Sequence, residues 1–171
     1  GALRFGSAGN GTITQLSGEL FAEAVGIRLE HIPYRGSAPS LTDLLAGRVQ
    51  LLFDPVAIPA VKDGRILGLA TLAEQRNPDL PDVKTLAELG HPNALAVPWY
   101  GVAAPAGTSR EVIDRLATAI GGALAMPVAA TGMAPMGMAP VFERGEVFAT
   151  RVAREREAYG ALVRRLGVQP A

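Results

Sequence analysis

The sequence predicts an α/β fold in which helices flank a mostly parallel sheet. Short apolar runs alternate with helical patterns through the first half of the chain, which is typical of this class. One of these runs, VQLLF at 49–53, is continuously apolar, as expected for a strand buried on both faces. The 171 residues suffice for one domain with its own core or for one lobe of a larger protein.

Apolar residues, glycines and prolines place the elements of the first half. Apolar residues recur at helical spacing over 12–25, and Gly26 follows as a C-cap. Pro33 restricts the next strand to an edge or an end of the sheet, and Ser37 is expected to N-cap the helix after it. In order, we expect a helix at 12–25, a strand at 29–34, a helix at 37–47, a strand at 49–53, a helix at 57–64, a strand at 66–72 and a short helix at 85–89.

The second half is predicted to hold two helices and their connections. An extended stretch at 94–109 is interrupted by prolines, and Thr108 with Glu111 has capping-box spacing before a helix at 112–126. The segment 126–140, rich in Ala, Gly, Pro and Met, is expected to be a flexible connection. The last helix is expected at 144–166, with an apolar face that we interpret as core rather than a partner groove: Val147, Phe148, Val152, Tyr159, Leu162, Val163 and Leu166.

Composition excludes several classes of function. Sixteen basic residues balance sixteen acidic ones, so no net field favours nucleic acid or a membrane surface. The chain has no cysteine and only two histidines, which excludes disulfides, thiol catalysis and a histidine-rich metal centre. No stretch approaches the roughly 20 apolar residues of a membrane span. We expect neither a metal nor a cofactor.

The segment FGSAGNGT, residues 5–12, brings three glycines and two hydroxyl side chains to the start of the first helix. It lacks the Lys-Ser/Thr pair of a P-loop, the glycine order of a dinucleotide fingerprint and the glycine-to-serine spacing of a nucleophile elbow. A hydrolase that uses Ser7 has no identifiable base, because neither His31 nor His91 lies in a recognisable context. We therefore expect no enzyme and assign no catalytic residue.

Anion capture at a helix N-terminus is the chemistry that this segment retains. The first helical turn leaves backbone N–H groups unpaired, and the helix dipole adds partial positive charge there. Glycines let a ligand approach the backbone, and Ser7, Asn10 and Thr12 add side-chain donors. The alternative is an ordinary Asn-Gly turn with Thr12 as the helix cap, and the residues alone leave both open.

Two further strand-to-helix junctions share this layout. YRGS at 34–37 and FDP at 53–55 each follow an apolar run and precede a helix. In an open parallel sheet such junctions gather at the carboxyl edge of the strands, where ligands bind. Asp54 either accepts a hydrogen bond from a ligand or caps the helix that begins at Pro55.

Four longer motifs carry a resemblance to a known family. FGSAGNGT with LSGELF, HIPYRGSAPSLTDLLAGRVQLLFD, LPDVKTLAELG and WYGVAAPAGTS occur in this order from about Leu3 to Thr108. Together they resemble the Bug, or TctC-like, extracytoplasmic solute receptors, which are the substrate-binding proteins of tripartite tricarboxylate transporters. The resemblance continues more loosely to Leu166.

The resemblance implies a periplasmic-binding-protein-like (type II) lobe. The family's receptors have two α/β lobes that close over a small carboxylate, such as a di- or tricarboxylate or an amino acid. This chain would supply the second, ligand-binding lobe at 1–107 and C-terminal helices at 108–171, packed on that lobe or towards the first. The first lobe would precede Gly1, and we expect the chain to be a processed or trimmed product. The resemblance also implies a periplasmic location.

The resemblance assigns the ligand site residue by residue. The loop that matches 5–12 contributes direct hydrogen bonds, while a first-lobe loop holds the other carboxylate through ordered waters. Family members commonly have a histidine where this chain has Gln15, and an asparagine where it has Pro55, which removes an amide and a backbone donor. We expect the carboxylate to bind to Ser7, Ala8, Gly9, Asn10, Gly11 and Thr12, and selectivity to depend on Gln15, Tyr34, Ser37 and Asp54.

The expected partners are the carboxylate, the first lobe and membrane transporter subunits. An alternative is a stand-alone interaction module that forms a homodimer through the apolar surface that the first lobe would cover. A small-molecule hydrolase is the least favoured alternative.

Overall fold

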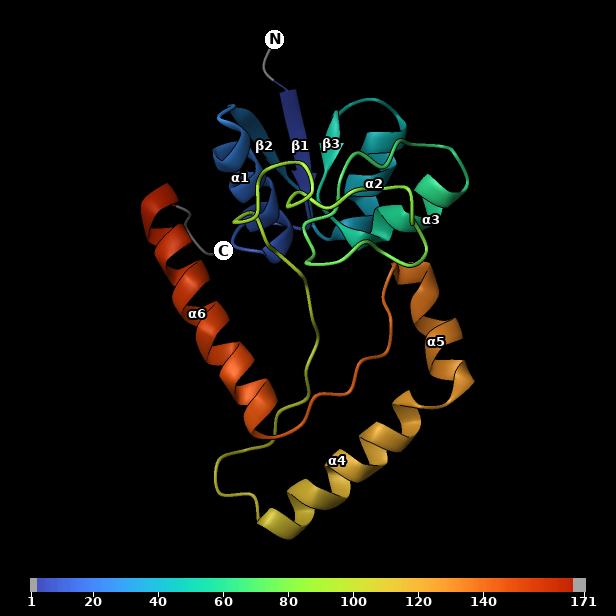
Figure 1. The fold of residues 1–171 in the computed structure, drawn as a ribbon, viewed down its shortest axis with the longest axis vertical. Helices are drawn as coiled ribbons and strands as arrows, with labels where there is room; N and C mark the ends of the chain where they lie inside the picture. The colour runs from blue at the N-terminus through green and yellow to red at the C-terminus, as the bar shows by residue number, and fades with distance from the viewer. Residues whose placement is uncertain (1–2, 168–171) are drawn as a thin grey trace.

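Three parallel strands form the sheet (Figure 1), which confirms the predicted parallel α/β class, although its central strand was not among the strands predicted. The computed structural model describes residues 3–167, and its central strand is β1 (Leu3–Ser7). β2 (Leu29–Pro33) pairs along one side of β1, and β3 (Leu51–Leu52) pairs along the other. Pro33 therefore ends an edge strand, as its missing N–H requires.

Helices α1 (Ile13–Val25) and α2 (Ser37–Leu45) pack against the strands at two positions where β1 and α1 lack bulk. Phe5 is fully buried against α1, where a Cβ on Gly18 would lie 2.3 Å from Phe5 Cε2. The next residue of β1, Gly6, contacts α2, and a Cβ there would lie 2.3 Å from Ser40 Oγ. Since successive residues of a strand point to opposite faces, both helices are held close to the sheet by a missing side chain.

The C-terminal part of the chain extends away from the sheet and then returns to it (Figure 1). After β3 come the 3-10 turn η1 (Pro55–Ala57) and the short helix α3 (Ile58–Lys62), and then a long irregular segment. Helices α4 (Arg110–Leu124) and α5 (Pro127–Met133) form an arm, and a second 3-10 turn, η2 (Ala134–Met136), brings the chain back against η1 and α3. The last helix, α6 (Glu146–Leu166), returns to α1, where Arg165 pairs with Glu23 at 2.5 Å.

Two of the predicted N-caps are displaced by one residue. Gly36, not Ser37, is the N-cap of α2, because the Ser37 hydroxyl donates to Asp54 and makes no capping bond. Ser109, not Thr108, caps α4 by accepting from Val112 N, while Thr108 donates to the Pro105 carbonyl. By contrast, Gly26 caps α1 in the left-handed conformation (φ +70°), as predicted.

Several predicted strands and turns are corrected by the structure. The strand expected at 49–53, buried on both faces, is only two residues long. Both residues are half-buried, because this strand lies at the edge of the sheet and not at its centre. The range 66–72 forms no strand: Thr71 makes a single bridge to Thr85, and Leu67 is 87% exposed. The short helix expected at 85–89 is a run of turns instead, in which the Glu88 carboxylate accepts from Thr85 N.

The C-terminal part also differs from expectation. The segment 126–140 is not simply a flexible connection, since it contains α5 and η2, and α6 begins at residue 146 rather than 144. On α6, Leu162 is buried but Val147 is 66% exposed, so the apolar face is core only near its C-terminal end. The side chain of Leu166 lies outside the described residues. The division at residue 107 stays a prediction.

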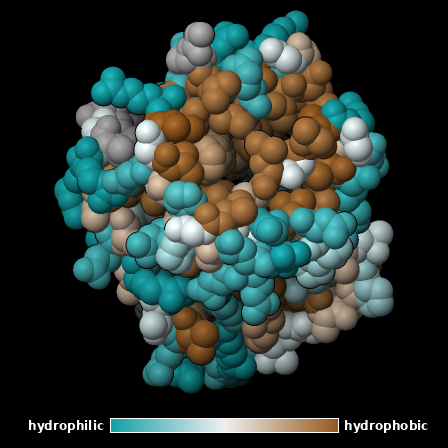
Figure 2. All heavy atoms as spheres, turned by 45° about the horizontal axis from the view of Figure 1, so that its top comes forward, coloured by the Kyte–Doolittle hydropathy of each residue, from teal (hydrophilic) through white to brown (hydrophobic). Residues whose placement is uncertain are grey.

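Hydrophobic side chains are widely exposed. Helix α4 contains no buried residue, and Figure 2 shows hydrophobic residues gathered around a hollow on one face of the molecule. Within residues 3–167, no single helix is long and apolar enough to cross a membrane; α4 and the segment Pro127–Met136, bent by 75°, meet the length and composition test only as a pair.

Candidate functional site

The three strand-to-helix junctions meet at the carboxyl edge of the sheet, as predicted. The Ser7 carbonyl accepts from Tyr34 N at 3.1 Å, and the Ala8 carbonyl accepts from Gly36 N at 3.1 Å. The Ser37 hydroxyl then donates to Asp54 Oδ2 at 2.5 Å. These bonds connect the loop after β1 to the junctions after β2 and β3, so the predicted residues form one cluster.

Two glycines give the loop after β1 its shape. Gly9 has φ +136° and Gly11 has φ +71°, values that other residues rarely adopt. A Cβ on Gly9 would also lie 3.3 Å from the Tyr34 carbonyl oxygen. The missing side chain of Gly9 thus allows the loop to lie close to the junction after β2, while the approach of a ligand to these glycines stays a prediction.

The loop's own side chains already bind several of its N–H groups. Thr14 Oγ1 accepts from Ala8 N at 2.9 Å, and Gln15 Oε1 accepts from Gly11 N at 2.8 Å. Within the described part of the chain, no hydrogen bond satisfies the backbone N–H groups of Asn10, Ile13 and Thr14. These three donors lie at the positive end of α1, where Asn10 is exposed and Thr14 is buried.

Thr12 is the N-cap of α1, so the capping alternative is confirmed. Its Oγ1 lies 3.5 Å from Gln15 N and donates to the Gly9 carbonyl at 2.6 Å. Capping and anion binding do not compete here, since the cap satisfies the Gln15 N–H and leaves those of Ile13 and Thr14 unbound.

Gln15 is buried beneath the loop, with 7% of its surface exposed. Its side chain spans from Gly11 N to the half-buried Glu19 one turn later in α1. Burial raises the pKa of the Glu19 carboxyl, and the hydrogen bond from Gln15 acts in the opposite direction. The structure thus places Gln15 as a brace between the loop and α1.

The Tyr34 hydroxyl is engaged away from the loop. It donates to Asp43 Oδ2 at 2.8 Å, and Asp43 also pairs with Arg48 at 2.7 Å. Burial and the hydrogen bond to Asp43 raise the pKa of Tyr34. The hydrogen bond from Arg48 has the largest effect on the Asp43 carboxyl and lowers its pKa, and the hydrogen bond from Tyr34 lowers it further. Tyr34 therefore attaches the end of β2 to α2, with its ring beside Gly6.

Asp54 uses both carboxylate oxygens within the chain. Oδ1 accepts from Val56 N at 3.0 Å and caps η1, which confirms the capping alternative for this residue, and Oδ2 accepts from Ser37. A ligand that contacts Asp54 would therefore share an oxygen with one of these donors.

Sequence reasoning missed the partner of Ser7. Ser7 Oγ lies 2.6 Å from His31 Nε2, so the expectation that no base stands near Ser7 is wrong. The signal was the parallel pairing of the first two strands, whose register sets His31 beside Phe5, two residues before Ser7 on the same face. Ser7 is nevertheless completely buried, which withholds its hydroxyl from a substrate in solution.

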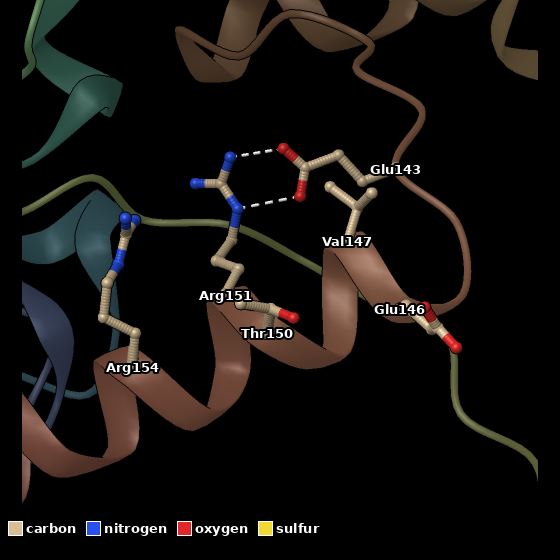
Figure 3. A pocket seen from close by; sticks show the side chains of 6 residues that line it. All are labelled: Glu143, Glu146, Val147, Thr150, Arg151 and Arg154. Carbon is tan, nitrogen blue, oxygen red and sulfur yellow. Dashed lines mark hydrogen bonds and ion pairs between the residues drawn. The ribbon is translucent and has the colours of Figure 1, made fainter.

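A hollow beside the N-terminal part of α6 is separate in sequence from the predicted site (Figure 3). Its lining residues are Glu143, Glu146, Val147, Thr150, Arg151 and Arg154. Figure 3 shows Arg151 and Glu143 joined by two parallel hydrogen bonds. This bond holds the pKa of the Glu143 carboxyl below its usual range and commits the guanidinium to a partner.

Comparison with known proteins decides the family. The sequence matches the family described as "Tripartite tricarboxylate transporter family receptor" over residues 1–168. The chain belongs to this family. As a TctC-type receptor it is 38% identical, over 168 residues, to the "UPF0065 protein in tcbD-tcbE intergenic region" of Pseudomonas sp. (strain P51), covering 95% of this chain and 49% of that protein.

Solved structures of TctC-type receptors share its fold. An R. palustris protein in a structure with adipate superposes with a TM-score of 0.84 at 31% identity, covering 99% of this chain and 57% of that one. MatC from Rhodopseudomonas palustris with bound malate gives 0.77 at 28% identity, covering 94% and 56%. The chain therefore has the periplasmic-binding-protein fold that the motifs predicted, and it spans about half the length of the curated relatives it matches.

The family consists of solute-binding receptors and not of enzymes, in agreement with the expectation from the sequence. Among the described residues, no group of three or more His, Cys, Asp or Glu side chains is arranged to hold a metal ion.

Proposed function

We propose that this chain binds a small carboxylate at the N-terminus of α1, as one half of a periplasmic receptor that delivers its ligand to a tripartite transporter. One observation carries the proposal: the N–H groups of Asn10, Ile13 and Thr14 are unbound at the positive end of a 13-residue helix. Two or three such donors suffice for a carboxylate without a formal positive charge.

The other predicted residues receive distinct roles in this proposal. Ser7, Ala8, Gly9 and Gly11 set the path of the loop, Thr12 caps α1, and Asn10 is exposed on the loop. Gln15, Tyr34, Ser37 and Asp54 border the site and limit which ligands fit, as argued from the sequence. The adipate and malate in the structures of two relatives support a dicarboxylate as the ligand class.

A further lobe would complete the site. Helix α4 exposes apolar side chains, among them Val112 at 44% and Leu116 at 47%. We infer that the rest of the receptor covers this face and closes over the ligand, which would remove water from it. In this proposal the other half of the cleft belongs to that further lobe, so the chain alone is expected to bind weakly, and the closed two-lobed form is the one that would dock on the transporter.

Two glycines at opposite ends of α1 provide a matched test. Gly11 (φ +71°) and Gly26 (φ +70°) have the same left-handed conformation, and a Cβ on Gly26 has no neighbour within 4 Å. Gly11→Ala should strain the loop and weaken binding of adipate or malate about tenfold or more, whereas Gly26→Ala should strain α1 equally and leave binding unchanged.

Binding is followed by NMR titration of the labelled chain with adipate, malate and an amino-acid panel. Equal losses in both variants would show that the effect is one of stability and not of the site. Micromolar affinity in the unmodified chain would show that this lobe suffices without another.

Self-association is a second candidate function, favoured by the exposed face of α4, on which no residue is buried. Two copies could cover this face by pairing it. Sedimentation discriminates between the two functions, since a chain that stays monomeric at high concentration contradicts the self-association module.

A further inference from the structure

Ser7 Oγ is the point at which three groups meet. It lies 2.6 Å from His31 Nε2, 3.1 Å from Gly9 N and 3.2 Å from the Gly9 carbonyl oxygen. The hydroxyl accepts from the Gly9 N–H and has a single proton to donate. That proton goes either to His31 or to the Gly9 carbonyl.

The Gly9 carbonyl already has a closer donor than Ser7. Thr12 Oγ1 donates to it at 2.6 Å, and Thr12 N lies 3.4 Å away. The 2.6 Å contact with His31 is also the shorter of the two open to Ser7. With a neutral imidazole, the Gly9 N–H therefore donates to Ser7 Oγ, and the Ser7 hydroxyl donates to His31 Nε2. We call these two hydrogen bonds the relay.

The fold fixes the positions of both Ser7 and His31. Ser7 and Phe5 are fully buried, and the His31 ring packs against the Phe5 ring with centroids 4.9 Å apart. His31 is on the edge strand β2, held by its register with β1. The sheet therefore sets the position of His31, and the hydrogen bonds through Ser7 connect His31 to the loop after β1.

We propose that His31 is a positioning residue for the carboxylate loop: acting through Ser7, it sets the direction of the Gly9 N–H and with it the path of the loop over Ala8 to Thr12. The inference rests on the proposed function and deepens it, because it names a residue outside the predicted site on which the ligand geometry depends. His31 itself does not contact the ligand.

The surroundings of His31 favour the neutral form of its ring. Burial lowers the pKa of the imidazole, and no charged group contributes to that shift. Arg4 and Glu30 pair one position before Phe5 and His31 in the register of β1 and β2, so their side chains point to the opposite face of the sheet from His31. On α1, Glu19 contacts Gln15, and Glu23 pairs with Arg165 of α6.

Protonation of His31 would reverse the direction of its hydrogen bond with Ser7. An imidazolium Nε2–H donates to Ser7 Oγ, so the Ser7 proton must turn to the Gly9 carbonyl and compete with Thr12. The amide of Gly9 should therefore report the titration of His31, with a midpoint below the ordinary 6.5 because the folded protein disfavours the charged form.

Three variants test the relay on the ¹⁵N-labelled chain. His31→Phe keeps a ring against Phe5 and removes the nitrogen, whereas His31→Gln keeps an acceptor near the place of Nε2. Ser7→Ala removes the junction itself. His91→Phe is the matched control, since no hydrogen bond of its side chain occurs among the described residues.

We expect hydrogen exchange at Gly9 to accelerate about threefold to tenfold in His31→Phe and in Ser7→Ala, the factor for one hydrogen bond. His31→Gln should stay within about twofold of the unmodified chain, and His91→Phe should not change it. The pH profile of the Gly9 amide should disappear in His31→Phe and Ser7→Ala, and the double variant should lose no more than either single one.

Adipate titration is measured on the same samples to separate the two claims. A Gly9 amide that exchanges and titrates normally in His31→Phe and Ser7→Ala overturns the relay, whether or not adipate binds. A chain that binds no dicarboxylate, while Gly9 responds as expected, contradicts the proposed function and supports the relay.

Discussion

The contact between Gly6 and Ser40 offers a quantitative test of how α2 is held against the sheet. Gly6→Ala would place a Cβ 2.3 Å from Ser40 Oγ, 3.2 Å from Tyr34 Cε2 and 3.5 Å from Ser40 Cβ. Overpacking of this kind costs about 1–3 kcal/mol. Replacing glycine within a strand returns about 0.5–1 kcal/mol, so a net loss of about 1–2 kcal/mol is expected.

Ser40→Ala should remove the obstacle. Ser40 is fully buried, and its hydroxyl has no hydrogen-bond partner. Since an unsatisfied buried hydroxyl is unfavourable, Ser40→Ala alone should be neutral or stabilising by about 1 kcal/mol. In its presence the nearest atoms to the new Cβ on Gly6 are those of Tyr34 and Cβ of residue 40, at ordinary or slightly short distances.

Urea unfolding followed by circular dichroism measures all four proteins. The double variant should lie within about 1 kcal/mol of the unmodified chain, which makes the coupling between the two sites about 1–3 kcal/mol. Strictly additive effects, or a Gly6→Ala protein as stable as the unmodified one, would refute the reasoning that this missing side chain sets the distance from α2 to β1.

Two other contacts lead to predictions about the rest of the chain. Gly137→Ala should destabilise the packing of η2 by about 1–2 kcal/mol or more, because φ is +68° and a Cβ would lie 2.0 Å from the Pro55 carbonyl oxygen. Gly132→Ala in α5, where a Cβ would have no neighbour within 4 Å, should instead be neutral or stabilising by about 0.5–1 kcal/mol, and equal urea midpoints of the two variants would contradict this. Arg76 lowers the pKa of Glu88 to about 2, so its ionised form stabilises the fold above pH 4.5 and that contribution is lost as the pH falls towards 2. Glu88→Gln should flatten the acid-unfolding curve between these values, and an unchanged curve would exclude the contribution.

The elements between residues 12 and 47 were predictable because local signals and tertiary packing agree there, whereas the central strand β1 was not predicted. The amphipathic spacing of residues 13–25 and the left-handed Gly26 define α1 almost by themselves. The three strand-to-helix junctions lie together because the strands are parallel, as predicted. Thr12 caps α1 and Asp54 caps η1, which was one of the two alternatives left open for each residue.

Other features depend on long-range pairing that one sequence does not display. The apolar range 66–72 is typical of a strand, but only Thr71 finds a partner, so the pattern alone was insufficient. The contact of Ser7 with His31 depends on the register of two strands 24 residues apart. Likewise, Gln15 was expected at the ligand, whereas the structure shows its amide oxygen on Gly11 N.

Binding at the N-terminus of α1 is the central claim, and amide shift mapping of the chain with adipate tests it most directly. The account predicts saturable shifts centred on the amides of Asn10, Ile13 and Thr14, reduced in Gly11→Ala and retained in Gly26→Ala. Saturable shifts centred on the α6 hollow around Arg151 instead, with Asn10 unmoved, would contradict it.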